Sequence, residues 1–89
     1  MTKQEFNQLV NEGIDRNKNF IMVKIETEGN PDVEIIVNSK ENFDQKIKYY
    51  EKAYNDDMEL IKAKEAGKII RITDVLMTSN LTDLSWFAY

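Results

Sequence analysis

The chain of 89 residues contains no cysteine and no histidine. This absence excludes disulfide bridges, thiolate nucleophiles, imidazole acid–base catalysis and zinc sites of the usual kind. Glycine occurs three times and is never clustered, so no glycine-rich loop is present to cradle a phosphate group. No apolar run approaches the roughly 20 residues that span a bilayer. The sequence therefore predicts a protein without a cofactor, a bound metal or a membrane association.

Charge and composition place the chain among ordinary globular domains. The formal net charge is −4, whereas binding to phosphate backbones needs clustered Lys and Arg, so we expect no direct nucleic-acid binding. Apolar residues make up 42% and charged residues 31% of the chain, and its length suits one domain spanning residues 1–89. Because the N-terminal MTKQEFNQ is polar and unlike a signal peptide, we expect a cytoplasmic protein.

The most regular stretch is Glu41–Lys64, which holds no Gly or Pro. Its apolar residues are spaced by 4, 3, 4, 4 and 3 positions, which is the helical period: Phe43, Ile47, Tyr50, Tyr54, Met58 and Ile61. We predict one long helix, with Ser39 or Asn42 at its N-cap and Gly67 beyond its end. Asn55–Asp57 is its weakest place, where the helix could kink or a second helix could begin.

Shorter elements precede this helix. Thr2 and Glu5 have the spacing of a capping box, which predicts a helix over residues 3–13 that ends at Gly13. Alternating apolar and polar residues then predict strands over 20–28 and 33–38, joined as an antiparallel hairpin.

After the helix, Lys68–Met77 is rich in β-branched residues and predicts a strand. Leu84–Tyr89 could pair back as a fourth strand. The elements predict an α+β fold in the order αββαββ. It would contain a short N-terminal helix, an antiparallel sheet of three to four strands and one long central helix packed on one face.

Two sets of acidic residues are candidates for chemistry. Asp56, Asp57 and Glu59 offer oxygen ligands, but adjacent helical residues diverge by about 100° and the glycine of a calcium loop is missing. We interpret them as a solvent-exposed helix face. Asp74 and Asp83 could meet if a last hairpin forms, although an outer strand face and a turn are simpler positions for them. We therefore expect no enzymatic activity.

The remaining candidates could contact a protein partner. Four acids around the first hairpin could face a basic partner or keep the turn soluble. The last four residues hold three aromatics, a residue type enriched at interfaces. They could instead fill the core, with Trp86 inside and its neighbours outside, or the reverse. The predicted contact residues are Glu26, Glu28, Asp32, Glu34, Tyr49, Asp56, Asp57, Trp86, Phe87 and Tyr89.

The chain resembles small accessory proteins carried by phages and mobile elements of low-GC Gram-positive bacteria. The resemblance lies in its size, its bias toward Lys, Asn, Ile and Glu, its lack of Cys and His, and the phrase ENFDQKIKYYEKAYNDD. Such proteins include inhibitors of host defence, among them anti-CRISPR proteins, many of which are acidic and cover a nucleic-acid or effector surface. The resemblance implies a binding protein that occludes a host defence nuclease, and it assigns no individual residue.

Two considerations modify that expectation. Five Lys offset seven acids between Glu41 and Ala66, which departs from the pattern of a DNA mimic. The alternative is a structural, self-assembling protein that forms a homodimer through its last strand, which would also cover an apolar edge.

Overall fold

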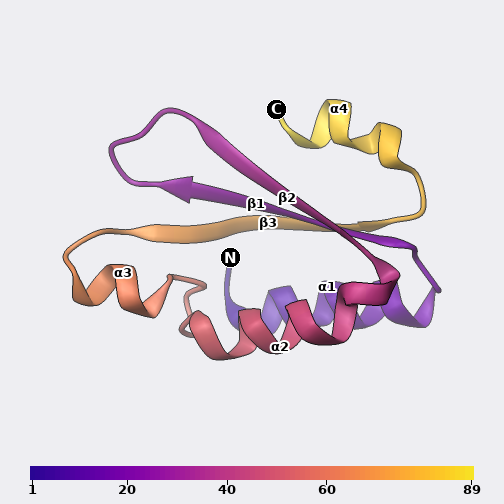
Figure 1. The fold of residues 1–89 in the computed structure, drawn as a ribbon, viewed down its shortest axis with the longest axis horizontal. Coiled ribbons are helices and arrows are strands. Elements are labelled where there is room, and N and C mark those ends of the chain that lie inside the picture. Colours follow the sequence, from indigo (N-terminus) through magenta and orange to yellow (C-terminus); the bar gives the residue numbers. More distant parts are fainter.

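A three-stranded antiparallel sheet separates the helices into two layers (Figure 1). The computed structural model describes residues 1–89. In chain order the elements are α1 (Lys3–Asp15), β1 (Phe20–Thr27), β2 (Val33–Ser39), the 3₁₀ turn η1 (Lys40–Asn42), α2 (Phe43–Ala53), α3 (Ile61–Glu65), β3 (Ile70–Thr78), the 3₁₀ turn η2 (Leu81–Asp83) and α4 (Leu84–Phe87). The predicted α+β class is confirmed, as are the first hairpin and the strand that follows the central helical region.

β1 is the central strand, and the sheet order is β2-β1-β3. Because successive side chains point to opposite faces, Ile21, Val23 and Ile25 face the layer of α1 and α2, while Met22 is buried on the other face. The core between the sheet and these helices contains Phe6, Val10, Ile21, Val23, Ile25, Phe43, Tyr50, Tyr54, Met58, Ile72 and Val75.

The predicted capping box at the start of α1 is confirmed. The Thr2 hydroxyl accepts from the Glu5 N–H at 3.1 Å, and the Thr2 N–H donates to the Glu5 carboxylate at 3.0 Å. The prediction that Gly13 ends this helix is wrong, because Gly13 is buried inside α1, which continues to Asp15. A Cβ atom on Gly13 would lie 2.2 Å from Cβ of Met77. Glycine at this position therefore allows α1 to approach β3 closely.

The single long helix predicted over Glu41–Lys64 is wrong, because α2 ends at Ala53 and the helix resumes only at Ile61. The Asn55 side-chain oxygen accepts from the backbone N–H groups of Asp57 and Glu59, at 3.0 and 2.9 Å, and closes a turn. Side-chain oxygens that satisfy nearby backbone donors compete with the helix in this way. The prediction that a second helix could begin within Asn55–Asp57 is therefore also wrong, because α3 begins at Ile61.

The break allows the chain between α2 and α3 to pair with β3. The Leu60 N–H donates to the Ile70 carbonyl at 2.7 Å, and the Ile72 N–H donates to the Met58 carbonyl at 2.9 Å. Met58 is completely buried with a φ of 58°, in the left-handed region that non-glycine residues seldom adopt. Burial and these two hydrogen bonds compensate for the backbone conformation.

The ends of the helices agree in part with the sequence. Gly67 follows α3 with a φ of 81°, as predicted for a residue that terminates a helix. Ser39 and Asn42 occupy the N-cap positions of η1 and α2, but neither side chain makes a capping hydrogen bond. Helical structure therefore begins at the two predicted positions, but without the predicted side-chain capping hydrogen bonds.

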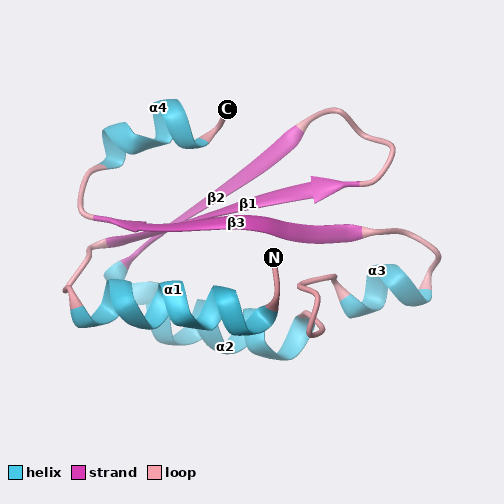
Figure 2. Cartoon of the chain, turned by 180° about the vertical axis from the view of Figure 1, so that it is seen from behind, coloured by secondary structure: helices cyan, strands magenta, loops and turns pink.

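The predicted fourth strand over Leu84–Tyr89 is wrong, because this segment forms α4. Figure 2 shows α1 and α2 under one face of the sheet and α4 over the other. The tail therefore adds a second, smaller apolar layer to the fold instead of extending the sheet. No helix in the structure combines the length and the apolar character needed to cross a membrane.

Candidate protein-contact surface

The face of the sheet that carries α4 is apolar in its middle. The register places Met22 opposite Val37 of β2 and Leu76 of β3, all on this face. Phe87 packs there with 2% of its surface exposed, and the Lys24 ammonium lies 4.9 Å from the centre of its ring. Phe87 is therefore the anchor of α4 on the sheet.

A network of side-chain hydrogen bonds fixes the start of α4. Asn80 caps η2, because its side-chain oxygen accepts from the Thr82 N–H at 3.1 Å. The Asp83 carboxylate accepts from the Thr78 hydroxyl at 2.6 Å and from the Trp86 indole N–H at 3.1 Å. Asp83 thus connects the end of β3 to the one tryptophan of the chain.

These hydrogen bonds hold the pKa of Asp83 below its ordinary value of 3.8, with the Thr78 hydroxyl as the largest cause and the Trp86 indole next. Lys18 contributes electrostatically in the same direction. Because the carboxylate form is the one that binds these donors, Asp83 stabilises the fold in its ionised state.

We expect the attachment of α4 to weaken in acid. A carboxyl group whose pKa is lowered by folding contributes stability that is fully present above its unfolded-state pKa and is lost as the pH falls through its folded-state pKa. For Asp83 this loss should occur below pH 3.8. The fluorescence of Trp86 measures it directly, since no other tryptophan contributes. Asp83→Asn is the control, and identical acid profiles for the two proteins would show that Asp83 does not hold α4.

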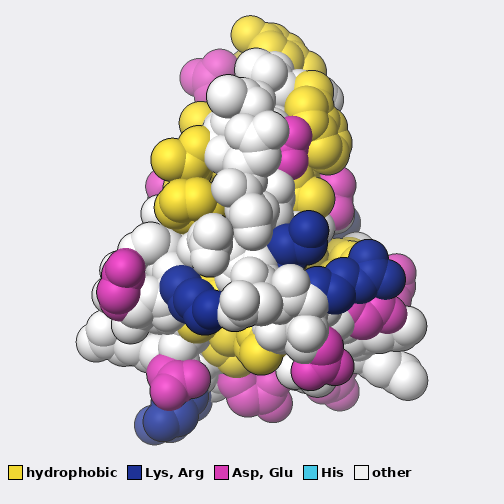
Figure 3. Space-filling view, turned by 90° about the vertical axis from the view of Figure 1, so that its right-hand side faces the viewer, with side chains coloured by type: hydrophobic (Ala, Val, Ile, Leu, Met, Phe, Trp, Pro, Cys, Tyr) yellow, Lys and Arg dark blue, Asp and Glu magenta, His cyan; other side chains and the backbone are white.

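The segment that holds η2 and α4 exposes large apolar side chains. We call this the α4 surface; Trp86 is 58% exposed and Tyr89 98% exposed, and its members are Leu81, Leu84, Trp86 and Tyr89. Figure 3 shows hydrophobic side chains gathered at the top of the molecule, where α4 lies, and charged side chains mostly around its base. Contiguous exposed apolar patches mark interaction sites more often than isolated apolar side chains do.

The structure unites only part of the predicted contact surface. Trp86 and Tyr89 belong to the α4 surface, but Phe87 does not, because it is buried against the sheet. The prediction that Phe87 contacts a partner is therefore wrong. Of the two core arrangements considered for the tail, the one with Trp86 outside is correct for Phe87, which is buried, and wrong for Tyr89, which is exposed. Trp86 and Phe87 meet edge to face with ring centres 6.1 Å apart.

The predicted acids do not form one continuous surface. Glu26, Glu28, Asp32 and Glu34 are all exposed, but the strand pleat directs Glu26 toward the face of α4 and Glu34 toward the face of the other helices. Asp56 and Asp57 lie in the turn after α2, and the carbonyl of Asp56 accepts from the N–H of Lys3. Of the predicted acids in β1 and β2, the register places only Glu26 on the same side of the sheet as α4.

Tyr49 is half-exposed on α2, in edge-to-face contact with Tyr50 and Tyr54. Burial raises the pKa of Tyr50 to about 12, with smaller contributions from Tyr49 and Glu34. Tyr49 therefore belongs to a tyrosine cluster beneath the sheet and is separate from the α4 surface.

Leu81 and Leu84 are exposed apolar residues that the sequence interpretation did not include among its contact residues, because it assigned the tail to a strand. Two signals were present in the sequence. Asn80 precedes Asp83 by three residues, as a helix N-cap precedes its acidic partner, and Leu81, Leu84 and Phe87 recur at every third position.

Three of the acidic residues considered for chemistry, Glu59, Asp74 and Asp83, have structural roles. Glu59 is paired with Lys64 at 2.8 Å and accepts from Asn55 at 3.1 Å. Asp74 accepts from the N–H of Val75 and lies opposite Lys24 in the sheet. No three carboxylates are grouped so that they could hold a metal ion.

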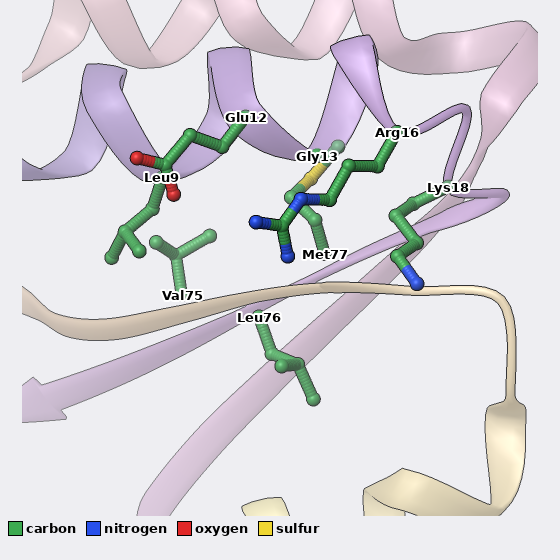
Figure 4. A pocket seen from close by; sticks show the side chains of 8 residues that line it. All are labelled: Leu9, Glu12, Gly13, Arg16, Lys18, Val75, Leu76 and Met77. Carbon is green, nitrogen blue, oxygen red and sulfur yellow. The ribbon is translucent and has the colours of Figure 1, made fainter.

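A hollow of about 150 Å³ lies between α1 and β3. Figure 4 shows Leu9 and Val75 at one end, and the side chains of Arg16 and Lys18 extending toward β3 at the other. Its charged lining residues are Glu12, Arg16 and Lys18, and its apolar lining residues are Leu9, Val75, Leu76 and Met77.

No protein-family model matches the chain, and neither does any curated protein or any solved structure. The functional interpretation therefore depends on the geometry of the α4 surface.

Proposed function

We propose that this chain is a non-enzymatic binding protein that acts by covering the surface of a protein partner, and that the α4 surface makes the main contact. The observation that carries the proposal is the 58% exposure of Trp86 on a segment that is itself anchored. Tryptophan is among the residues most enriched in interface hot spots, because it buries a large area with few rotatable bonds.

The anchoring of α4 is what makes this surface suited to binding. Association is weakened by the entropy lost when mobile side chains and segments become ordered. Here Phe87 is already packed on the sheet, and the Trp86 indole already donates to Asp83 at 3.1 Å. A partner would therefore meet a largely preformed surface and would lose little affinity to ordering.

The chemistry of the chain restricts the partner. The α4 surface requires an apolar pocket for Trp86, and the net charge of −4 favours a partner with a basic rim. The resemblance to small phage accessory proteins suggests a narrower form of the proposal, in which the partner is a host defence nuclease. The net negative charge of the chain supports this narrower proposal, because the surface by which a nuclease binds nucleic acid is basic.

Affinity capture from a bacterial lysate, followed by titration calorimetry with the captured protein, tests the proposal. Wild-type protein should retain one protein in stoichiometric amount, and Trp86→Ala should weaken its binding at least about 30-fold, the effect of a hot-spot residue. Ile14→Ala, at a residue 46% exposed on α1, is the matched control and should bind normally. Capture of no stoichiometric protein, or equal binding by Trp86→Ala, would refute the proposal.

The alternative function expected from the sequence was self-assembly through the last strand. That route is excluded in its original form, because Leu84–Tyr89 contains α4 and offers no strand edge.

A further inference from the structure

The two edges of the sheet differ in how they are protected. Along β3, part of the outer edge is occupied, because the Leu60 N–H donates to Ile70 and the Ile72 N–H donates to Met58. The register also shifts at Thr73, which forms a bulge. Occupied backbone groups and bulges are two devices by which proteins prevent a strand from pairing with another chain.

The opposite edge, β2, has none of these devices. Its seven residues, VEIIVNS, pair with β1 in an unbroken register on one side, and the only isolated bridges of the structure lie elsewhere. Four of the seven are Val or Ile, and none is Lys or Pro. A regular apolar edge of this kind is a template for another strand.

The sequence of β2 is complementary to itself when read antiparallel. Two copies of β2 can pair antiparallel about a two-fold axis that is normal to the sheet. Residues that lie opposite each other must then point to the same face of the sheet. The axis must therefore pass through a residue of β2 and not between two residues. The register centred on Ile36 aligns all of Val33–Ser39 with its copy. It also brings Asp32, the residue before β2, close to Lys40, the residue after β2, of the second copy, twice in each dimer. Both side chains are exposed in the single chain.

The same register would satisfy a polar group that lacks a partner. The side-chain Nδ2 of Asn38 is buried and has no hydrogen-bond acceptor within one copy. Pairing centred on Ile36 places Glu34 of the second copy opposite Asn38, on the face toward α1 and α2. A carboxylate is an acceptor, so this arrangement provides what the single chain lacks.

We propose that two copies of this chain form a dimer by antiparallel pairing of β2 with β2, centred on Ile36. Three strands from each copy then form one continuous sheet in the order β3-β1-β2-β2-β1-β3.

The helix layer has a matching exposed flank. Lys3 and Asn7 of α1 contact Glu51 on one side of α2, and Tyr49 lies roughly 160° around the helix from Glu51. Tyr49 therefore points away from α1, on the flank next to β2, and is 49% exposed. Figures 1 and 2 show α1 and α2 side by side beneath the sheet, so a copy paired at β2 would bring its own α2 toward Tyr49.

The dimer is independent of the proposed binding function. With the axis normal to the sheet, both α4 surfaces remain free and face the same way, so the dimer would present two contact sites in one direction. Dimerisation can fail while Trp86 still binds a partner, and the converse also holds, so the two experiments test separate claims.

A charge exchange measured by sedimentation equilibrium tests the dimer and its register. Wild-type protein should dimerise at concentrations below about 1 mM. Asp32→Lys and Lys40→Glu should each weaken the dimer about tenfold, because each places like charges opposite one another twice. The double variant should recover wild-type affinity to within about threefold. Glu12→Lys, on α1, makes the same charge change as Asp32→Lys at a place away from β2 and should have little effect.

Two outcomes would overturn the inference. A wild-type monomer at about 1 mM would remove the dimer, and a dimer insensitive to both Asp32→Lys and Lys40→Glu would exclude pairing through this edge. Circular dichroism of each variant separates a loss of pairing from a loss of folding.

Cross-linking gives a second, independent readout, since the chain has no cysteine of its own. Opposed Cα atoms in antiparallel strands lie about 4.5–5.5 Å apart, within the range that a disulfide spans. Mild oxidation should therefore link Ile36→Cys into a covalent dimer. The two copies of Val33→Cys would lie about 20 Å apart and should remain unlinked. Equal linking of the two variants would contradict the register.

Discussion

Replacing Phe87 by alanine is expected to lower the free energy of unfolding by about 3–5 kcal/mol, the usual loss for a large buried aromatic side chain. Phe87 is 2% exposed and is the side chain that attaches α4 to the sheet, under the Lys24 ammonium. Its removal would leave a cavity between the two layers. Trp86→Ala, one residue earlier, should cost about 1 kcal/mol or less, because most of this side chain is in water.

Urea unfolding followed by circular dichroism measures both variants, since the loss of Trp86 would remove the fluorescence signal from one of them. The two residues are neighbours of similar size, so each is a matched control for the other. If Trp86→Ala proved the more destabilising of the two, the tail would have the reverse orientation, with tryptophan in the core and Phe87 outside.

The second large effect is expected at Gly13. Gly13→Ala should lower the free energy of unfolding by about 3 kcal/mol, because the added Cβ would lie 2.2 Å from Cβ of Met77. Both atoms are attached directly to the backbone, so α1 and β3 would have to separate. This loss should outweigh the gain of about 1 kcal/mol that alanine normally brings to a helix interior.

Thermal unfolding of Gly13→Ala and of Asn11→Ala separates the two effects. Asn11 is exposed on the same helix, so alanine there should leave stability unchanged or slightly increase it. The cost of Gly13→Ala should also shrink in a Met77→Gly background, in which the opposing Cβ is absent. A stabilised Gly13→Ala protein would show that this glycine serves no packing purpose.

The elements that local sequence signals specify were predictable. Thr2 and Glu5 alone define the start of α1, and the alternation in Phe20–Thr27 and Val33–Ser39 defines the hairpin. Each of these signals is satisfied by residues close in sequence, through a cap, a pleat or a turn. No distant contact is needed to choose among alternatives there.

The prediction of one long central helix was wrong for the opposite reason. Its apolar period continues through Tyr54 and Met58, and both are buried as predicted. They are buried from a turn, however, because Asn55 satisfies the local N–H groups and the chain beyond it finds partners on β3. Periodicity records which residues are buried and does not specify the backbone that buries them.

The contact surface was predictable in composition and not in arrangement. Aromatic residues in the tail indicated an interface, but a run of this length fits a strand or a short helix equally well. Phe87 is distinguished from Trp86 by its packing on the distant sheet face, whereas the hydrogen-bond partner of Trp86 is Asp83, three residues before it. Likewise, alternation in β2 did not reveal that Val37 would share the face of α4.

Quenching of Trp86 fluorescence by acrylamide tests the central claim most directly, because the chain contains one tryptophan. In the isolated folded protein, quenching should approach that of the urea-unfolded chain, and it should fall strongly when the captured partner is bound. A folded protein whose tryptophan is shielded from acrylamide before any partner is added would contradict the exposed position of Trp86, and with it the α4 surface as a site of binding.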